Sequence, residues 1–253
     1  MPVKQFQHEP EEQTKSFKQA LLNNLNNNNS SSIAIIAEIK RRSPSRGDLN
    51  AELNPAHIAV AYRDGGASCL SVLTNQTMFS GSIDDLKQAA QASGLPVLRK
   101  DFITTTQDVY DSQQMGAAAV LLIVADLLLP THKGPDLAEL HHLALTLGMD
   151  ALVEVKSSRE LEVALAAGAQ IIGVNQRAKP KSQTYTMDFQ RAERMASLLP
   201  DHVVKVAESG IAVTGGTSIA TIRQAGYHAA LIGEALVTAE DPAMRLRELL
   251  AQD

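Results

Sequence analysis

Short apolar runs alternate with longer amphipathic stretches from Ile33 to the end of the chain. This alternation is typical of βα units that build a parallel sheet, with strands of four to eight residues followed by helices. We predict eight strands, at residues 33–39, 68–73, 96–99, 118–123, 151–155, 170–174, 202–206 and 229–232. We also predict eight helices, at residues 55–65, 82–93, 106–115, 135–148, 157–167, 188–198, 215–225 and 240–251.

Eight βα units in a stretch of this length predict an α/β fold of the (β/α)8 TIM barrel class. A doubly wound sheet usually has fewer strands and a glycine-rich first turn, whereas the first turn here contains Ser43 and Pro44. Neither G-x-G-x-x-G after a strand nor a P-loop motif occurs, so no nucleotide cofactor is expected. Several predicted helices end at a glycine suited to a left-handed conformation, including Gly66 and Gly94.

The chain before the barrel predicts a short helical extension. Residues 11–22 can form an amphipathic helix with Phe17, Leu21 and Leu22 on one side, whereas the Asn/Ser tract at 23–32 favours an irregular linker. We therefore expect an N-terminal helix and linker over residues 1–32 and a catalytic barrel over residues 33–253. The first ten residues lack the apolar core of a signal peptide, and no apolar run approaches the roughly 20 residues that span a bilayer. A cytoplasmic protein is expected.

Composition narrows the range of partners. The chain has 253 residues, 44% of them hydrophobic, which is enough to bury a large core, and a formal net charge of -5. This charge argues against nucleic acid or an acidic membrane as a partner. The one cysteine, Cys69, lies in an apolar run and is expected to be a small buried side chain rather than a reactive thiol. The histidines show no metal-ligand spacing, so no metal site is expected.

Charged residues gather where the predicted strands end, which in a barrel is the end that carries the chemistry. The first strand ends in Glu38-Ile39-Lys40, and a period of two places both charged side chains on one side. Because buried charges cost several kcal/mol unless paired or hydrated, a pocket is favoured over a solvated edge strand. Lys100 follows the third strand, and Glu154 lies within the fifth, where an unpaired carboxylate would be costly.

The later strands end in further polar groups and glycines. Lysines and carboxylates that converge with little water are tuned for proton transfer, and glycines after the last two strands of a barrel commonly bind phosphate. Structural alternatives remain open: a solvated position for Lys100, a salt bridge from Glu208 to Lys205, and a hydrogen bond from Asn175 to a loop carbonyl. The candidates here are Asn175, Arg177, Glu208, Ser209, Gly210, Gly233 and Glu234, with Ser43 in the first loop.

Several long motifs occur in barrel order, at residues 37–45, 71–74, 79–82, 95–102, 120–124, 152–155, 172–175, 207–211 and 231–234. In these motifs the chain resembles the indole-3-glycerol phosphate synthase family of tryptophan biosynthesis. The resemblance implies a carboxy-lyase that converts 1-(2-carboxyphenylamino)-1-deoxyribulose 5-phosphate into indole-3-glycerol phosphate, with loss of CO2 and water. It implies a phosphorylated small-molecule substrate and no cofactor.

The resemblance also implies roles for individual residues. Lys100 matches the general acid that protonates the carbonyl oxygen during ring closure, and Glu154 matches the base for dehydration and rearomatisation. Lys40 matches the lysine that holds the substrate and shares the acid role. Glu38, Asn175, Glu208 and Ser209 match groups that orient the substrate and the lysines. The implied substrate contacts are Arg177, with Ser43, Gly210, Gly233 and the Glu234 amide for the phosphate, and Pro44, Phe79, Phe102, Leu121 and Ile123 for the anthranilate ring.

This chain departs from the family pattern in a few places. Gln176 stands where Asn or Ser is usual, and Asn75 and Met78 stand where Asp and Phe are common. The loop at 178–186 looks longer and more basic than usual, and only residues 11–22 could form the N-terminal cover over the substrate. Two alternatives follow: a paralogue that performs a related decarboxylative indole-forming cyclisation in secondary metabolism on a different substrate, or a catalytically silent barrel in a complex. A monomer is expected.

Overall fold

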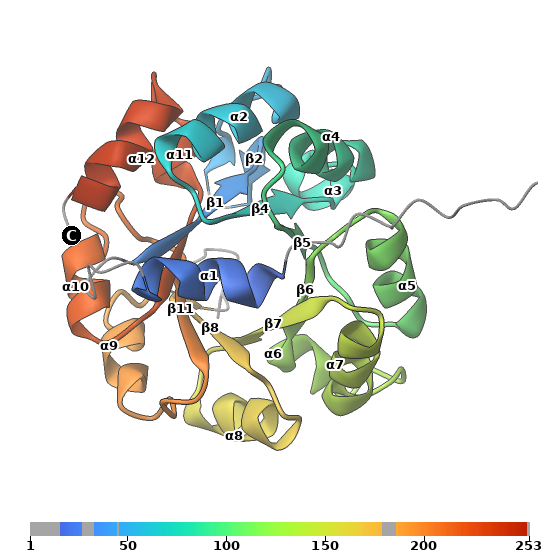
Figure 1. The fold of residues 1–253 in the computed structure, drawn as a ribbon. Coiled ribbons are helices and arrows are strands. Elements are labelled where there is room, and N and C mark those ends of the chain that lie inside the picture. The colour runs from blue at the N-terminus through green and yellow to red at the C-terminus, as the bar shows by residue number, and fades with distance from the viewer. Residues whose placement is uncertain (1–15, 27–32, 45, 179–185, 252–253) are drawn as a thin grey trace, which may run out of the picture.

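The computed structural model describes residues 16–26, 33–44, 46–178 and 186–251. At its centre, eight parallel strands form a closed barrel, which confirms the predicted fold class (Figure 1). Each predicted strand is present, with bounds that differ by at most two residues. In order around the barrel they are β1 (Ala34–Ile39), β12 (Ala229–Ile232), β11 (Val204–Glu208), β8 (Ile171–Asn175), β7 (Asp150–Val155), β6 (Ala119–Ile123), β5 (Val97–Lys100) and β4 (Cys69–Leu73).

The predicted helices form a ring around the strands (Figure 1). They are α2 (Pro55–Gly65), α4 (Ile83–Ser93), α5 (Thr106–Gln114), α7 (Leu137–Thr146), α8 (Ser158–Ala166), α9 (Arg191–Ala196), α10 (Ile219–Gln224) and α12 (Pro242–Ala251). Side chains of Asn54, Ser82 and Thr105 accept hydrogen bonds from first-turn amides of α2, α4 and α5, which explains why these helices begin there. Gly66 and Gly94 end α2 and α4 at φ values of 100° and 64°, as predicted.

Some short elements follow the strands without a signal in the sequence. Helices α3 (Gln76–Phe79), α6 (Val124–Leu127) and α11 (Glu234–Val237) have four residues each, too few to show a helical period. Two small antiparallel pairs also form, β2 (Arg42–Ser43) with β3 (Gly47–Asp48) and β9 (Arg177–Ala178) with β10 (Thr186–Met187). The remainder of the loop predicted to be long and basic, residues 179–185, lies outside the described residues. In the described part, no helix combines the length and apolar character that crossing a bilayer requires.

Helix α1 (Phe17–Asn26) crosses the end of the barrel where the strands begin (Figure 1). Phe17 and Leu21 are fully buried among the side chains inside the barrel, including Cys69. At the start of β7, Asp150 Oδ2 accepts hydrogen bonds from Ser16 Oγ at 3.0 Å and from the Lys18 backbone amide at 2.9 Å. The described part of the extension therefore closes the end opposite the strand termini that carry the charges. The expectation that this helix covers the substrate is wrong.

The position of α1 also corrects the predicted linker. Residues 23–26 of the Asn/Ser tract continue the helix, while residues 11–15 of the predicted helix and 27–32 of the predicted linker lie outside the described residues. Once the buried residues Phe17 and Leu21 fix the first turns, each further residue adds one hydrogen bond at small cost. Tertiary packing thus extends a helix whose composition alone favours a coil.

Side chains inside the barrel form layers that come from alternate strands, as in other TIM barrels. Strands β1, β11, β7 and β5 occupy every second position around the barrel. They contribute a buried apolar layer of Ile36, Val206, Leu152 and Leu98. Two residues further along, the same strands place Glu38, Glu208, Glu154 and Lys100. One interior layer is therefore made of three glutamates and a lysine.

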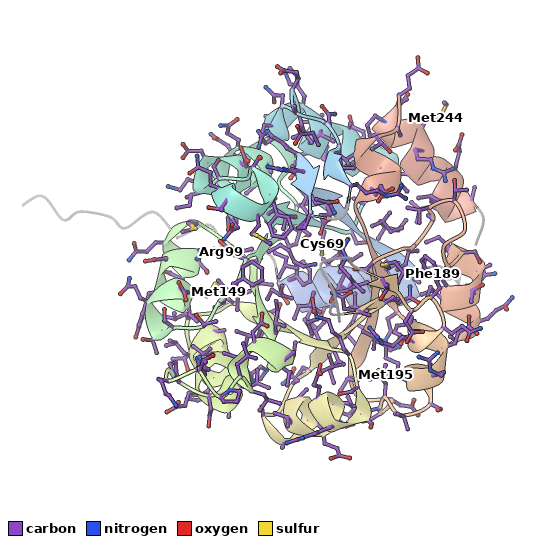
Figure 2. The ribbon with its side chains drawn as sticks, turned by 180° about the vertical axis from the view of Figure 1, so that it is seen from behind. Cys69, Arg99, Met149, Phe189, Met195 and Met244 are labelled. Carbon is purple, nitrogen blue, oxygen red and sulfur yellow. The ribbon has the colours of Figure 1, made fainter. Side chains whose placement is uncertain are left out.

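The cysteine has the structural role predicted from its neighbours. Cys69 is fully buried near the barrel axis, whereas Arg99 of the neighbouring strand lies towards the outer wall (Figure 2). Burial raises the pKa of the Cys69 thiol well above its usual range, and the nearby Asp150 carboxylate adds to the effect. A thiol held neutral and away from solvent is a packing group.

Candidate active site

A cavity of about 430 Å³ opens above the charged layer, at the C-terminal ends of the strands. Among the predicted site residues, Ser43 and Glu208 do not line it. Those that do are Glu38, Lys40, Pro44, Phe79, Lys100, Phe102, Leu121, Ile123, Glu154, Asn175, Arg177, Ser209, Gly210, Gly233 and Glu234. The pocket favoured on the pattern of β1 is thereby present, and it lies where the barrel fold predicts an active site.

Glu38 and Lys40 form an ion pair at the end of β1, as their spacing predicts. Their side chains are only 7% and 10% exposed, and Lys100 Nζ lies 3.7 Å from the other oxygen of Glu38. Burial alone would raise the pKa of Glu38, but the Lys40 and Lys100 ammonium groups outweigh it and lower the pKa to about 2. Glu38 is therefore a permanent anion beside two cations.

Lys100 reaches across the barrel from β5 to Glu208 on β11, the strand directly opposite. Its Nζ donates to Glu208 Oε2 at 3.0 Å, while Lys205 pairs instead with Asp201 at 3.3 Å. The suggested Glu208–Lys205 bridge and the solvated position for Lys100 are therefore wrong. Burial would lower the pKa of Lys100, but the carboxylates of Glu208, Glu38 and Glu154 raise it above its usual range.

Glu208 is the carboxylate of this layer whose ionised form is least favoured by its surroundings. It is fully buried, and its Oε1 has no hydrogen-bond partner among the described residues. Burial raises its pKa to about 6, with the Glu154 and Glu38 carboxylates adding to the rise and Lys100 opposing it. A carboxyl group with a pKa near neutrality, bonded to a lysine, is an arrangement that can exchange protons.

Glu154 pairs with a residue that the sequence analysis did not single out. Lys156 Nζ lies 2.9 Å from Glu154 Oε1, and both side chains line the cavity. Burial would raise the pKa of Glu154, but Lys156, Lys100 and a hydrogen bond with Asn175 lower it. The sequence does indicate Lys156, because Glu154-Val155-Lys156 repeats the acid–apolar–base pattern of Glu38-Ile39-Lys40. Asn175 bonds Glu154 and the Arg177 backbone amide rather than the loop carbonyl offered as an alternative.

Two glycines make room for this layer. A Cβ at Gly233 would stand 3.1 Å from both the Glu38 carboxyl carbon and Lys40 Nζ, inside normal contact distance. A Cβ at Gly173 in β8 would stand 3.1 Å from the Glu208 carboxyl carbon and closer still to Oε1. Absence of a side chain at these positions is therefore a condition for the ion pairs.

The residues expected to bind phosphate are partly brought together. Ser209 and Gly210 follow β11, Gly233 and Glu234 follow the adjacent strand β12, and all four line the cavity. Ser43 is different: it is buried outside the cavity lining, and its Oγ accepts a hydrogen bond from the Arg46 backbone amide.

Gln176, one of the departures from the family pattern, stabilises the loop after β11. Its side chain is fully buried, and Nε2 donates to the Ser209 carbonyl at 2.9 Å and to Thr217 Oγ1 at 3.2 Å. These bonds hold Ser209 at a left-handed φ of 68°, which a non-glycine residue adopts only where its surroundings enforce it. The substitution therefore acts on loop geometry from outside the cavity.

An apolar wall lines the other side of the cavity. Phe79 and Phe102 stack with ring centroids 6.4 Å apart, and Leu121 and Ile123 of β6 also line the space. A flat aromatic group fits between such side chains.

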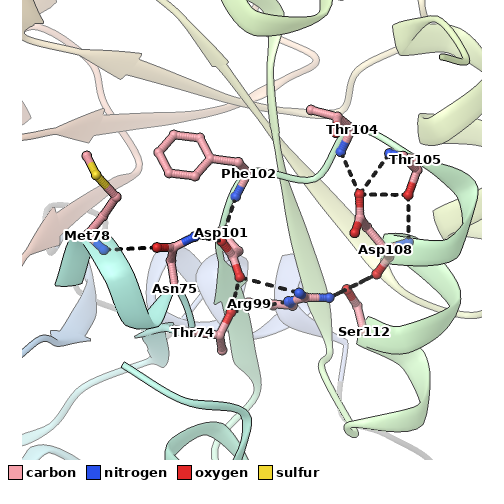
Figure 3. Close-up of polar contacts among 10 residues, drawn as sticks. All are labelled: Thr74, Asn75, Met78, Arg99, Asp101, Phe102, Thr104, Thr105, Asp108 and Ser112. Atoms are coloured by element: carbon pink, nitrogen blue, oxygen red, sulfur yellow. Dashed lines mark hydrogen bonds and ion pairs between the residues drawn. The ribbon is translucent and has the colours of Figure 1, made fainter. Parts of the chain in front are cut away.

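Asp101, next to Lys100, fixes the loops that carry this wall (Figure 3). Its Oδ1 accepts from the Phe102 amide at 2.9 Å and from Asn75 Nδ2 at 3.2 Å, while Oδ2 accepts from Thr74 Oγ1 at 2.6 Å. Arg99 bonds the same Oδ2 at 3.3 Å and also donates to α5, at the Asp108 carbonyl and at Ser112 Oγ, each at 3.0 Å. Asn75 also caps α3.

The structure contains no arrangement suited to a metal within the residues it describes, since no three His, Cys, Asp or Glu side chains converge in the required way. The chemical resources of the cavity and of the charged layer beneath it are three buried glutamates, three lysines, an aromatic wall and backbone amides. Such a set can donate and accept protons around a ring-bearing anion.

Comparisons with known proteins agree with this chemistry. A family model described as indole-3-glycerol phosphate synthase matches residues 1–249. Proteins of that name from Mycolicibacterium vanbaalenii and Leifsonia xyli subsp. xyli are each 45% identical, covering 87% and 85% of this chain and 77% and 79% of theirs.

Solved structures agree on the fold. The N-acetylmannosamine-6-phosphate 2-epimerase from Clostridium perfringens is 13% identical with a TM-score of 0.61, over 88% of this chain and 94% of that one. A thiamine phosphate pyrophosphorylase from Pyrococcus furiosus, also 13% identical, has a TM-score of 0.57, over 88% and 96%. The family model, by contrast, spans both the barrel and its charged layer. The chain therefore belongs to the indole-3-glycerol phosphate synthase family.

Proposed function

We propose that this chain closes the indole ring of 1-(2-carboxyphenylamino)-1-deoxyribulose 5-phosphate, giving indole-3-glycerol phosphate, CO2 and water. The observation that carries the proposal is the buried Lys100 ammonium in a layer of three glutamates at the cavity floor. The family model and the named relatives support the same reaction. They give no support to the alternative cyclisation in secondary metabolism.

In the first step, the ring carbon that bears the carboxylate attacks the carbonyl carbon, and a C–C bond forms. The carbonyl oxygen gains negative charge and takes a proton from Lys100 Nζ, which Glu208 at 3.0 Å and Glu38 at 3.7 Å hold in place. CO2 then leaves, and its bonding electrons neutralise the ring cation. The raised pKa of Lys100 ensures that the proton is present near neutral pH.

In the second step, the new hydroxyl group leaves as water after it takes a second proton, which we assign to Lys40. Glu154 then removes a proton from the substrate carbon and restores an aromatic ring. Its lowered pKa keeps it ionised as a base at neutral pH. Two protons enter and one leaves, so the solvent supplies one proton for each turnover.

The rest of the cavity holds the substrate. We assign the phosphate to the backbone amides after β11 and β12, the aromatic ring to the stacked wall, and the ring carboxylate to the side of Lys40 and Arg177. Ser43 lies outside the cavity lining, so it would reach the phosphate only after a movement of the loop that follows β1. The groups assigned to the phosphate are Gly210, Gly233 and Glu234, and those assigned to the ring are Pro44, Phe79, Phe102, Leu121 and Ile123.

Indole fluorescence after mixing the protein with the substrate tests the reaction. We expect a rise that Lys100→Ala and Glu154→Gln each abolish, while Lys133→Ala, at an exposed lysine, leaves it unchanged. The absence of any rise with a folded protein would contradict the proposal. Turnover lost in Lys100→Ala would also exclude the catalytically silent barrel.

Phosphate recognition needs a separate test, because a side chain at Gly233 would also displace Glu38 and Lys40. Indole-3-glycerol phosphate should therefore raise the Tm of the wild-type protein more than indole-3-glycerol does. Equal shifts would remove the phosphate assignment and leave the ring assignment standing.

We further propose a cytoplasmic location, since a phosphorylated substrate does not cross membranes freely, and a monomeric state, since one barrel supplies every assigned group. The net charge of -5 gives no reason to expect nucleic acid as a partner. Light scattering on the purified protein tests the monomer.

A further inference from the structure

We propose that Lys156 is a positioning residue that keeps Glu154 ionised and aimed into the cavity. The inference deepens the proposed function and rests on it, because the role of Glu154 as a base is part of that proposal. Lys156 follows the last residue of β7 and lines the same cavity as Glu154.

The geometry of the pair is that of a sheltered ion pair. Lys156 Nζ lies 2.9 Å from Glu154 Oε1, and the two side chains are 19% and 3% exposed. The backbone at Lys156 is also fixed, because its amide donates to Glu160 Oε2 at 2.7 Å, in the first turn of α8. Strand β7 and helix α8 thus hold both ends of the pair.

The charge balance of the interior layer gives the reason for such a residue. The layer holds three glutamates but only one lysine, Lys100, which is already bonded to Glu208 at 3.0 Å. Lys40 balances Glu38 on β1, and Lys156 balances Glu154 on β7, at the opposite side of the barrel. Without Lys156, the Glu154 and Glu208 carboxylates would compete for the single ammonium of Lys100.

Other groups act on Glu154 from the neighbouring elements. Asn175 of β8 hydrogen bonds to it, Lys100 of β5 attracts it, and Glu208 of β11 repels it. Asp126 of α6 also lines the cavity and carries a further negative charge. Among the groups that lower the pKa of Glu154, Lys156 has the largest effect, ahead of Lys100. Loss of that ammonium must therefore favour the protonated, inactive form of the base.

The test compares the pH dependence of kcat for the wild type and Lys156→Met. A base must be deprotonated to act, so a raised pKa of Glu154 moves the acidic limb of the profile to higher pH. We expect a shift of about one to three pH units, with the rate recovering at high pH. Lys156→Arg should restore the wild-type limb, since it keeps the positive charge.

Two controls distinguish the positioning role of Lys156 from a general loss of folding or activity. Lys205→Met removes another lysine–carboxylate pair outside the cavity lining and should leave the pH profile unchanged. In a Glu154→Gln background, where binding of indole-3-glycerol phosphate is the readout, adding Lys156→Met should cause no further change. That background also keeps the test usable if Lys156→Met alone folds poorly, because the lone buried charge is gone.

The pH profile of kcat for Lys156→Met decides whether Lys156 has this role. An acidic limb of Lys156→Met that overlays the wild type overturns the inference, as does an equal loss of rate at every pH with a raised KM, which would indicate a direct substrate contact. Inactivity of the wild-type protein itself would refute the proposed function instead, so the two failures are distinguishable.

Discussion

Gly173→Ala should impair catalysis, although the substitution adds only one methyl group inside strand β8. The new Cβ would stand 3.1 Å from the Glu208 carboxyl carbon and 3.3 Å from Leu152 Cδ1, where ordinary contact begins at 3.4 Å. Because Oε1 lies closer still, the carboxylate must move by about 1 Å or more, away from its 3.0 Å bond with Lys100.

The expected magnitudes follow from that displacement. Misplacing a group that orients a catalytic residue by about 1 Å costs on the order of 10²-fold in rate. Overpacking a close-fitting interior costs about 1–3 kcal/mol of stability. Gly94→Ala is the matched control, because a Cβ at Gly94 would meet no atom within 4 Å but the backbone there has a φ of 64°. This substitution should lower the free energy of unfolding by about 1 kcal/mol without affecting kcat.

Steady-state indole formation and urea unfolding measure the two effects. A double-mutant cycle gives the sharpest test: with Glu208→Ala the clashing carboxylate is gone, so adding Gly173→Ala should change kcat little. If Gly173→Ala slows the Glu208→Ala enzyme by as much as it slows the wild type, the methyl group acts through something other than Glu208, and the reasoning is refuted.

Three further predictions concern stability. Phe17→Ala should cost about 3–5 kcal/mol in urea unfolding with kcat unchanged, because α1 closes the end opposite the cavity; a loss of kcat without a loss of stability would contradict this. In the folded protein the pKa of Glu208 is about 6, above its ordinary value of 4.5, so the folded state binds more protons than the unfolded chain between these pH values. As pH rises through that window, the free energy of unfolding of the wild type should therefore fall by about 2 kcal/mol more than that of Glu208→Gln. Arg99→Met should lower the free energy of unfolding by about 3–5 kcal/mol and raise KM, because it leaves Asp101 without its cation and loosens the aromatic wall. An unchanged urea midpoint would contradict the stabilising role of the hydrogen bonds around Asp101.

The eight strands, eight main helices and most cavity residues could be predicted because each depends on local pattern. Glu38 and Lys40 show why: two charges two residues apart on one strand must share a face whatever surrounds them. The same rule applies to Glu154 and Lys156. The sequence therefore contained the spacing that indicates Lys156, although Lys156 was not among the predicted site residues. Helices of four residues, such as α3, carry no comparable signal.

Other features had no local signal because they join strands far apart in the chain. Lys100 and Glu208 are 108 positions apart, and only closure of the barrel sets β5 opposite β11. Phe17 and Leu21 could have covered either end of the barrel, and apolar burial at the strand starts decided which. Ser43 has the residue type of a phosphate ligand, but its hydroxyl group is directed to a turn amide.

The sequence by itself determined the alternation of strands and helices, the polar strand ends and the family. Hydrophobic periodicity, caps and motifs are properties of neighbouring residues, and the chain carries them before it folds. The tertiary structure alone decided that alternate strands place three glutamates and one lysine in a single layer, and therefore which carboxylate neutralises which lysine. Ion pairing in a buried site depends on distance and desolvation, and both exist only after the barrel has closed.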